Sequence, residues 1–327
     1  MPSKKTLSFL IKIGIVFLSF FFIYNKLELV SNDTLGDINY NSIFFKLKNN
    51  SSIIICVFFL MIINWLVEAF KWRFMILKIE KISILTSLRA VFSGITVSSF
   101  TPNRIGEYAG RVFCLEKGDR IQAVLITVLG SMAQLLTTIL FGSLAFYVLY
   151  ESLITKTEIF INLEISSLSF ILLFIINLSF LLIFFNISTL VNFLMKYKFF
   201  YFLENYINII SMFSYRDLFK VLLLSILRYL IFSSQFLILL NLFGVDIGLY
   251  EAVFSVMLVF FFITITPTIP LAEIGVRGSV ALLVFGLFSN NVVGILSSIF
   301  ILWIINLIIP AIIGSFFIFS LKFFRKS

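Results

Sequence analysis

The chain has 327 residues, of which 61% are hydrophobic and 13% charged, and its mean hydropathy is +1.11. A soluble domain cannot bury that much apolar surface, whereas repeated apolar runs of about 20 residues are typical of a helical protein that crosses a membrane many times. With no His and only two Cys, the chain offers no His-based catalysis and no metal or disulfide framework. No GxxxxGK[ST] sequence occurs, so we expect no ATP-hydrolysing motif and no cofactor.

Apolar runs predict an all-α integral membrane fold with about six full transmembrane helices. These runs lie at about 7–24, 53–70, 122–150, 165–187, 219–241 and 292–320. Two further apolar regions, 84–116 and 250–288, are interrupted by proline and charge, which predicts proline-broken re-entrant hairpins. No small-residue cleavage site follows the first run, so we expect a retained span. The aromatic-rich segment 188–218 suits either an amphipathic helix at the cytoplasmic interface or a packed connector.

The placement of Lys and Arg predicts the topology. With a cytoplasmic N-terminus and both hairpins re-entrant, most of the 25 basic residues fall inside, Lys71 among them. This bias agrees with the positive-inside rule and places both termini on the cytoplasmic side of a cell (inner or plasma) membrane. Hairpins that each cross twice would leave the flanking loops on the same sides, so that alternative stays open. We expect membrane lipids, and no nucleic acid, as partners.

The layout predicts one transmembrane domain, 1–327, made of two similar halves. Residues 1–150 are predicted to form two spans, a hairpin and a long span, in that order. Residues 165–320 repeat the order. Both hairpins begin with AVFS, at 90–93 and 252–255, and then reach a Thr-Pro. Each half has three full crossings, so the second half would be inverted relative to the first. Broken helices of inverted repeats meet near the midplane in many transporters.

The first hairpin places charge at membrane depth, where each charged group costs about 2.5–3.5 kcal/mol unless it is paired or faces a wet cavity. Pro102 ends one arm, and the second arm is expected to begin near Asn103 or Arg104. The free N–H groups of its first turn and the guanidinium of Arg104 would then suit a phosphate.

The rest of this arm supports that site. Arg111 follows two helical turns after Arg104 on the same face, and Glu107 can pair with either arginine. Gly106 and Gly110 form a GxxxG pattern that predicts close packing against a neighbouring helix.

The second hairpin repeats the theme after its own proline break. Pro267, Pro270 and Gly275 are predicted to form the turn, and Glu273 and Arg277 are an i,i+4 pair on the short helix that follows. The proline-broken arms favour a ligand site. A purely structural role, in which each Glu neutralises an Arg and pins the hairpins together, stays open.

Two further charged positions lie within the spans. Glu68 lies close to Trp65 and Trp72 near the end of the second run, which favours interfacial anchoring. Arg228 lies in a long span and either pairs with a hairpin Glu or lines the cavity.

Two segments of the sequence resemble the motifs of a known family. TPNRIGEYAGR, which ends at Arg111, resembles the PGRxGExxR signature of the lysylphosphatidylglycerol synthase/flippase membrane region, and PTIPLAEIGVRGSVAL resembles that family's second motif. Asn103 stands where the first motif usually has Gly, and Gly278 where the second usually has Glu. The resemblance implies movement of, or action on, an anionic lipid such as a phosphatidylglycerol derivative or a polyprenyl-phosphate-linked intermediate.

We therefore expect a flippase-type lipid transporter and no enzyme, because the aminoacyl-transfer domain that makes lysyl lipid is absent from these residues. The expected substrate-binding residues are Asn103, Arg104, Glu107, Arg111, Arg228, Glu273 and Arg277. Two other hypotheses stay open. One is an intramembrane transferase on a lipid-linked substrate, with Glu107 or Glu273 as base. The other is an accessory subunit of a partner synthase or glycosyltransferase; a homo-oligomer is also compatible with the sequence.

Overall fold

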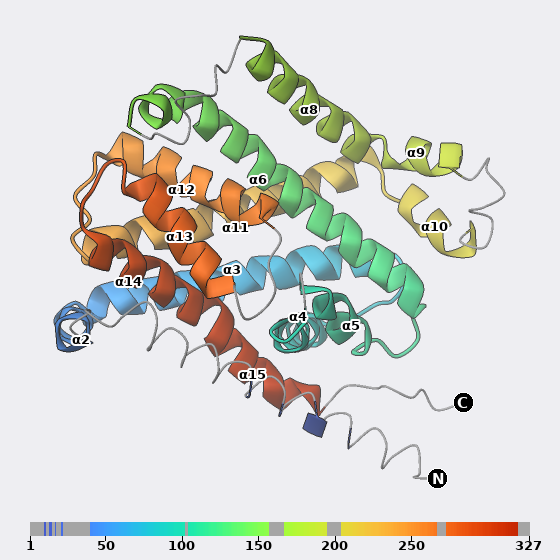
Figure 1. Cartoon of the computed structure of the whole chain (residues 1–327). Coiled ribbons are helices and arrows are strands. Elements are labelled where there is room, and N and C mark those ends of the chain that lie inside the picture. The colour runs from blue at the N-terminus through green and yellow to red at the C-terminus, as the bar shows by residue number, and fades with distance from the viewer. Residues whose placement is uncertain are drawn as a thin grey trace.

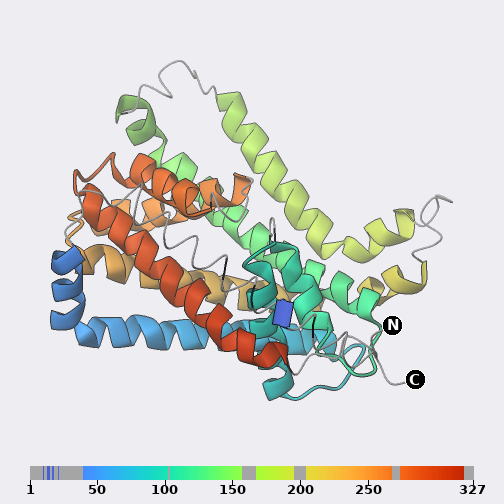
Figure 2. The same ribbon diagram turned by 60° about the horizontal axis from the view of Figure 1, so that its bottom comes forward.

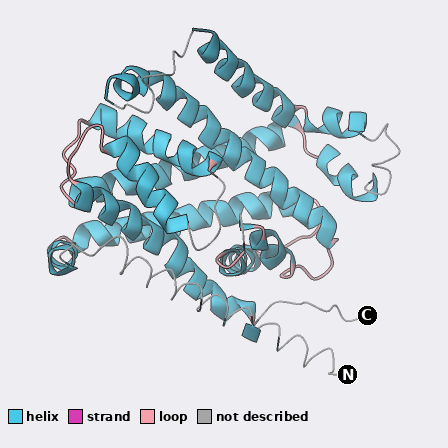
Figure 3. Cartoon of the chain, in the orientation of Figure 1, coloured by secondary structure: helices cyan, strands magenta, loops and turns pink. Residues whose placement is uncertain are grey.

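The chain folds into a bundle of helices. The computed structural model describes residues 40–101, 104–156, 167–194, 204–266 and 273–319, with Leu10, Ile13, Gly14, Phe17 and Phe21 of the first predicted span. Within these ranges every regular element is a helix and no strand occurs, which confirms the all-α fold (Figures 1 and 3). The elements are α2 (Tyr40–Asn49), α3 (Ser51–Ile76), α4 (Ile84–Ser98), α5 (Gly106–Val112), α6 (Arg120–Lys156), α8 (Ser167–Phe185), α9 (Ile187–Leu194), α10 (Glu204–Ser211), α11 (Tyr215–Leu242), α12 (Leu249–Ile265), α13 (Glu273–Phe285), α14 (Val292–Trp303), the π-helix η4 (Ile304–Ile308) and α15 (Ile309–Ile318).

Four stretches are long and apolar enough to cross a membrane: α3, most of α6, α11, and the continuous stretch formed by α14, η4 and α15. They confirm the spans predicted at 53–70, 122–150, 219–241 and 292–320. Within the run predicted at 165–187, residues 167–185 form α8, which meets α9 at an angle of 80°. A turn of this size is what a helix lying along the membrane surface would require. The interfacial placement of 188–218 stays a prediction, and most of the run 7–24 lies outside the described residues.

Both interrupted regions break where the sequence predicts. In the first region one helix ends at Ser98 and the next begins at Gly106. In the second region one helix ends at Ile265 and the next begins at Glu273. The first arms, α4 and α12, have 15 and 17 residues, fewer than the about 20 that span a bilayer. Re-entrant arms would have this length, although the inverted repeat itself stays a prediction. Pro102, Asn103, Pro267 and Pro270 lie outside the described residues.

The two helices of the first broken pair, α4 and α5, pack closely because glycines lie at their interface. A Cβ on Gly110 would lie 2.6 Å from the Cα of Gly94 and 2.7 Å from the carbonyl oxygen of Ser93, both on α4. A Cβ on Gly106 would lie 2.6 Å from the carbonyl oxygen of Val97. The GxxxG prediction is therefore confirmed, and the neighbour is the hairpin's own first arm.

The two broken pairs pack against shared helices. The α4–α5 pair contacts α3, α6 and α15, and the α12–α13 pair contacts α6, α11 and α14 (Figures 1 and 2). Helices α3 and α11 also pack on each other and on α6. A hydrogen bond from the Thr96 hydroxyl to the Ala311 carbonyl, 2.8 Å long, joins α4 to α15. This arrangement brings the two proline breaks, far apart in sequence, to one part of the molecule.

We expect Gly110→Val to destabilise the protein by about 1–3 kcal/mol, because the added side chain forces α5 away from α4. The measurement is the thermal unfolding midpoint of purified protein in detergent. Gly275→Val is the matched control, because a Cβ at Gly275 meets no atom within 4 Å. Equal midpoints for the two variants would contradict the close packing of α4 and α5.

Candidate functional site

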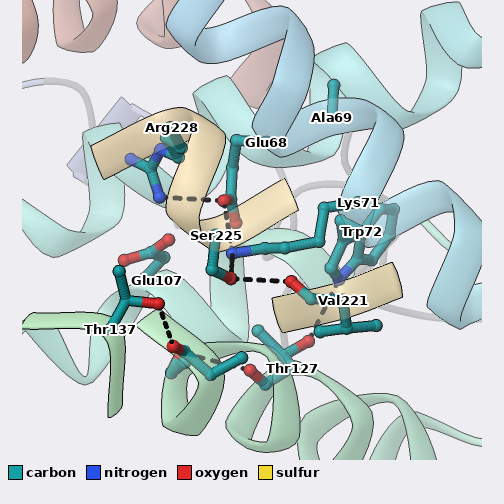
Figure 4. A network of polar contacts seen from close by, with 12 residues as sticks. Glu68, Ala69, Lys71, Trp72, Glu107, Thr127, Thr137, Val221, Ser225 and Arg228 are labelled. Carbon is teal, nitrogen blue, oxygen red and sulfur yellow. Dashed lines mark hydrogen bonds and ion pairs between the residues drawn. The ribbon is translucent and has the colours of Figure 1, made fainter. Parts of the chain in front are cut away.

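The centre of the site is the carboxylate of Glu68, which is 3% exposed on α3 (Figure 4). Its Oε1 accepts a hydrogen bond from Arg111 Nη1 at 2.8 Å. Its Oε2 accepts from Arg228 Nη1 at 2.8 Å and lies 2.9 Å from Lys71 Nζ. Arg111 also pairs with Glu107 through its Nη2. These residues form what we call the Glu68 cluster: Glu68, Lys71, Glu107, Arg111 and Arg228.

Local helix geometry explains part of this cluster. Glu68 and Lys71 are i,i+3 neighbours on α3, and Glu107 and Arg111 are i,i+4 neighbours on α5, so each pair lies on one helix face. The remaining contacts are tertiary, since Arg111 and Arg228 lie 43 and 160 residues from Glu68. The Arg228 guanidinium also stacks over the Trp65 ring at 4.8 Å, a favourable cation–π contact.

A second group of charges joins the two broken pairs. Glu273 is the first residue of α13, and its Oε1 accepts from Arg277 Nη2 at 2.9 Å and from Arg104 Nη2 at 3.5 Å. Arg104 precedes α5, so this contact connects the two proline breaks directly. We call Arg104, Glu273 and Arg277 the Glu273 cluster.

Arg104 has a strained backbone. Its φ of 58° is the only positive value among the non-glycine residues that the structure describes. Such a conformation costs about 1–3 kcal/mol and occurs preferentially at functional sites. Its side chain is 43% exposed, more than that of any other cation in the two clusters' ion pairs.

The two clusters face one cavity of about 360 Å³. Four cations line it, namely Lys71, Arg104, Arg228 and Arg277, together with Glu68 and Glu107. Counted over the ion pairs of both clusters, five cations meet three carboxylates, which leaves an excess of two positive charges. The volume is at the lower end for ligand pockets, about 300–1,000 Å³, and suits a small polar group.

Six of the seven predicted residues are brought together; Asn103 lies outside the described residues. Two expected pairs form, Glu107 with Arg111 and Glu273 with Arg277. Arg104 instead contacts Glu273. Arg111 is 3% exposed and meets the cavity through Glu68 and Glu107. Arg228 lines the cavity, which was one of its two predicted roles. Its ion pair is with Glu68 on α3 and not with a hairpin glutamate, which was the other.

One part of the expected phosphate site is wrong, namely the helix start that was to supply free N–H groups beside Arg104. Helix α5 begins at Gly106, two residues later than predicted, because Arg104 has left-handed backbone geometry. The first helical N–H, that of Gly106, already donates to the Thr101 hydroxyl at 2.9 Å. Gly275 is likewise helical, within the first turn of α13, and does not form a turn.

The interfacial anchoring predicted at the end of α3 is also wrong. Trp65 and Trp72 are 5% and 1% exposed, and the Trp72 indole donates to the Thr127 hydroxyl at 3.1 Å. An interfacial ring would instead face the lipid headgroups. Lys71, assigned above to the cytoplasmic side, is 2% exposed inside the bundle. The overlooked signal is the polar spacing of Asn64, Glu68 and Lys71, which places all three on one face of an apolar helix.

These features together define a multi-pass, all-helical membrane protein with a charged cavity between its helices. The model of the family described as lysylphosphatidylglycerol synthase TM region matches residues 39–314. The chain therefore belongs to that family, as its two motifs predict, and the family indicates a membrane protein involved in lipid handling. Comparisons with curated proteins and with solved structures gave no match.

We expect Glu68→Gln to lower the free energy of unfolding by about 3–5 kcal/mol, because it leaves buried cations without their shared carboxylate. Glu107→Gln should cost less, since the Glu107 side chain is 25% exposed and, among the described residues, forms its ion pair with Arg111. The measurement is chemical or thermal unfolding in detergent. Asp246→Asn, at an exposed position, serves as the control. A Glu68→Gln variant as stable as this control would show that Glu68 does not hold the cluster together.

Proposed function

We propose that the protein moves an anionic lipid across the bilayer, as a flippase-type transporter of a phospholipid or a polyprenyl-phosphate-linked lipid. The observation that carries this proposal is the excess of two positive charges around one cavity of a membrane protein. Unbalanced charge at membrane depth is costly, and a phosphate group would offset it through charge-assisted hydrogen bonds. Membership of a lipid-handling family supports the same conclusion.

The residues have distinct roles in this proposal. Arg104, Arg228 and Arg277 contact the phosphate, as cations that line the cavity. The carboxylates of Glu68 and Glu273 hold these arginines in place. Lys71 adds to the positive potential, and Arg111, buried against two carboxylates, positions them. The lipid tails would stay in the bilayer, because 360 Å³ accommodates a headgroup and no acyl chains.

In this proposal, the contact between Arg104 and Glu273 is the one that breaks when the two hairpins move apart. At 3.5 Å it is the longest ion pair in the two clusters, so an arriving phosphate replaces Glu273 as the partner of Arg104 at little cost. Because this contact joins the two broken pairs, its exchange would free α5 and α13 to separate. Binding of the headgroup would thereby be linked to movement of the hairpins.

We expect Arg104→Gln and Arg277→Gln each to slow lipid movement at least tenfold, since a hydrogen bond to a charged group contributes about 1.5–3 kcal/mol. The measurement is the rate at which tail-labelled phosphatidylglycerol in reconstituted vesicles becomes accessible to a membrane-impermeant reductant. Lys48→Gln, at an exposed position on α2, should leave that rate unchanged.

Unchanged rates in both arginine variants would contradict the proposal. The assay also separates transport from the accessory-subunit hypothesis, because an accessory subunit alone would not move the lipid. Product formation from a lipid-linked substrate would instead favour the transferase hypothesis.

A further inference from the structure

A groove lies on the outer surface of the protein, away from the charged cavity. It has a volume of about 470 Å³ and runs between α3 and α11. Its walls are Phe70, Arg73, Phe74 and Leu77 of α3 and Lys220, Leu223 and Leu224 of α11. None of these residues lines the cavity. Phe70 and Leu223 are 50% and 48% exposed, so the groove is open to the surroundings of the bundle.

The two cations of the groove lie near the ends of two membrane spans. Helices α3 and α11 have 26 and 28 residues, which gives lengths of about 39 and 42 Å at about 1.5 Å per residue. The hydrocarbon core of a bilayer is about 30 Å thick, so both helices reach the lipid headgroups. Arg73 lies three residues before the end of α3, and Lys220 is the sixth residue of α11. Their charges are therefore at headgroup level, while Phe70 and Leu223 lie further into the acyl chains.

Two contacts fix where these cations lie. Arg73 Nε donates to the Ile82 carbonyl at 2.9 Å, and the two Nη nitrogens of Arg73 have no hydrogen-bond partner among the described residues. Lys220 Nζ lies 5.7 Å from the centroid of the Phe74 ring, so this ammonium group of α11 reaches across to α3. Because Phe74 follows Arg73 directly, the two positive charges lie at the same end of the groove.

Among the described residues, no carboxylate neutralises these charges, since neither Arg73 nor Lys220 forms an ion pair. The acid nearest to Lys220 in the chain, Asp217, pairs instead with Lys78 at 3.0 Å. A second groove, of about 490 Å³, shares Lys220 and adds the cation Arg216 to the same part of the surface. An apolar groove with a positive end is complementary to an amphiphile with a negative headgroup.

We propose that the groove between α3 and α11 binds an anionic phospholipid of the surrounding membrane. The phosphate lies between Arg73 and Lys220, and one acyl chain follows Phe70 and Leu223 towards the middle of the bilayer. Basic pockets between transmembrane helices are typical binding sites for anionic headgroups. The bound lipid joins α3 to α11 from outside, on the side of these helices that faces away from the cavity. This site is separate from the proposed transport path and does not rest on the proposed function.

The test measures which lipid lies beside the groove. Leu223→Trp places a fluorescent reporter there, and the protein is reconstituted in equal parts of phosphatidylglycerol and phosphatidylcholine, with only one of the two brominated on its acyl chains. Bromine quenches a tryptophan that it contacts, so the two samples give the relative affinity. The three native tryptophans, at most 5% exposed, give a background that is measured on the protein without the reporter. Phe174→Trp, on α8 and 68% exposed in the native protein, is the matched control.

We expect phosphatidylglycerol to be preferred about tenfold at the groove, which is the effect of one or two cations near a membrane surface, and not to be preferred at position 174. The double variant Arg73→Gln/Lys220→Gln should abolish the preference. Arg277→Gln, which changes the cavity, should leave the preference unchanged.

Equal quenching by the two lipids at the groove would overturn the inference, as would a preference that survives in the double variant. An equal preference at position 174 would show that anionic lipid gathers around the whole protein, and would also overturn it. None of these results depends on lipid movement, so the inference and the proposed function fail separately. Should the double variant fail to fold, Lys220→Gln alone is compared, since it keeps the contact of Arg73 with Ile82. Retention of the full tenfold preference would then count against the site.

Discussion

The interior of this protein depends on a single carboxylate that is shared by three cations. Glu68 binds Lys71 on its own helix, Arg111 from the first broken pair and Arg228 from α11. In an apolar interior a charged group is tolerated only when it is paired, so these contacts hold α3, α5 and α11 in one arrangement. The buried charges thus fix the position of the first hairpin as well as the chemistry of the cavity.

The second cluster extends this constraint to the other hairpin through a weaker contact. Glu273 holds Arg277 on its own helix and reaches Arg104 across the two breaks. Glu68, Lys71 and Arg111 of the first cluster are almost fully buried. Arg104 is the most exposed of the residues in the two clusters, and its backbone is strained. The ion pairs around Glu68 therefore stabilise the site. The contact of Arg104 with Glu273 is the one for which a ligand would compete.

The sequence was sufficient for the features that depend on local patterns. Long apolar runs predict spans because a helix in a bilayer must be apolar along its length, and the prolines predict the two breaks. The glycine spacing in α5 predicts its close packing. The two family motifs contain the charged residues that meet in the structure. Arg104 of the first motif contacts Glu273 of the second, although they are 169 residues apart.

The features that the sequence did not predict are tertiary. Glu68 and Lys71 lie beside tryptophans near the end of an apolar run, a pattern shared by interfacial anchors, and only the packing of α11 and α5 shows that they are buried. The second arm begins later than expected, and its first N–H is already bonded, because of the backbone of Arg104 and the Thr101 hydroxyl. The amide oxygens of Asn64 and Asn306 are buried without a hydrogen-bond partner among the described residues. They come from helices that are distant in sequence, so no local pattern joins them.

The central claim is that the cavity between the two broken pairs binds a lipid phosphate. The most direct measurement is an experimental structure of the protein in lipid nanodiscs that contain phosphatidylglycerol. We predict phosphate density within hydrogen-bond distance of the Arg104, Arg228 and Arg277 guanidinium groups, with Arg104 no longer bound to Glu273. A structure in which lipid surrounds the outer surface while the cavity holds none, and Arg104 still contacts Glu273, would contradict that claim.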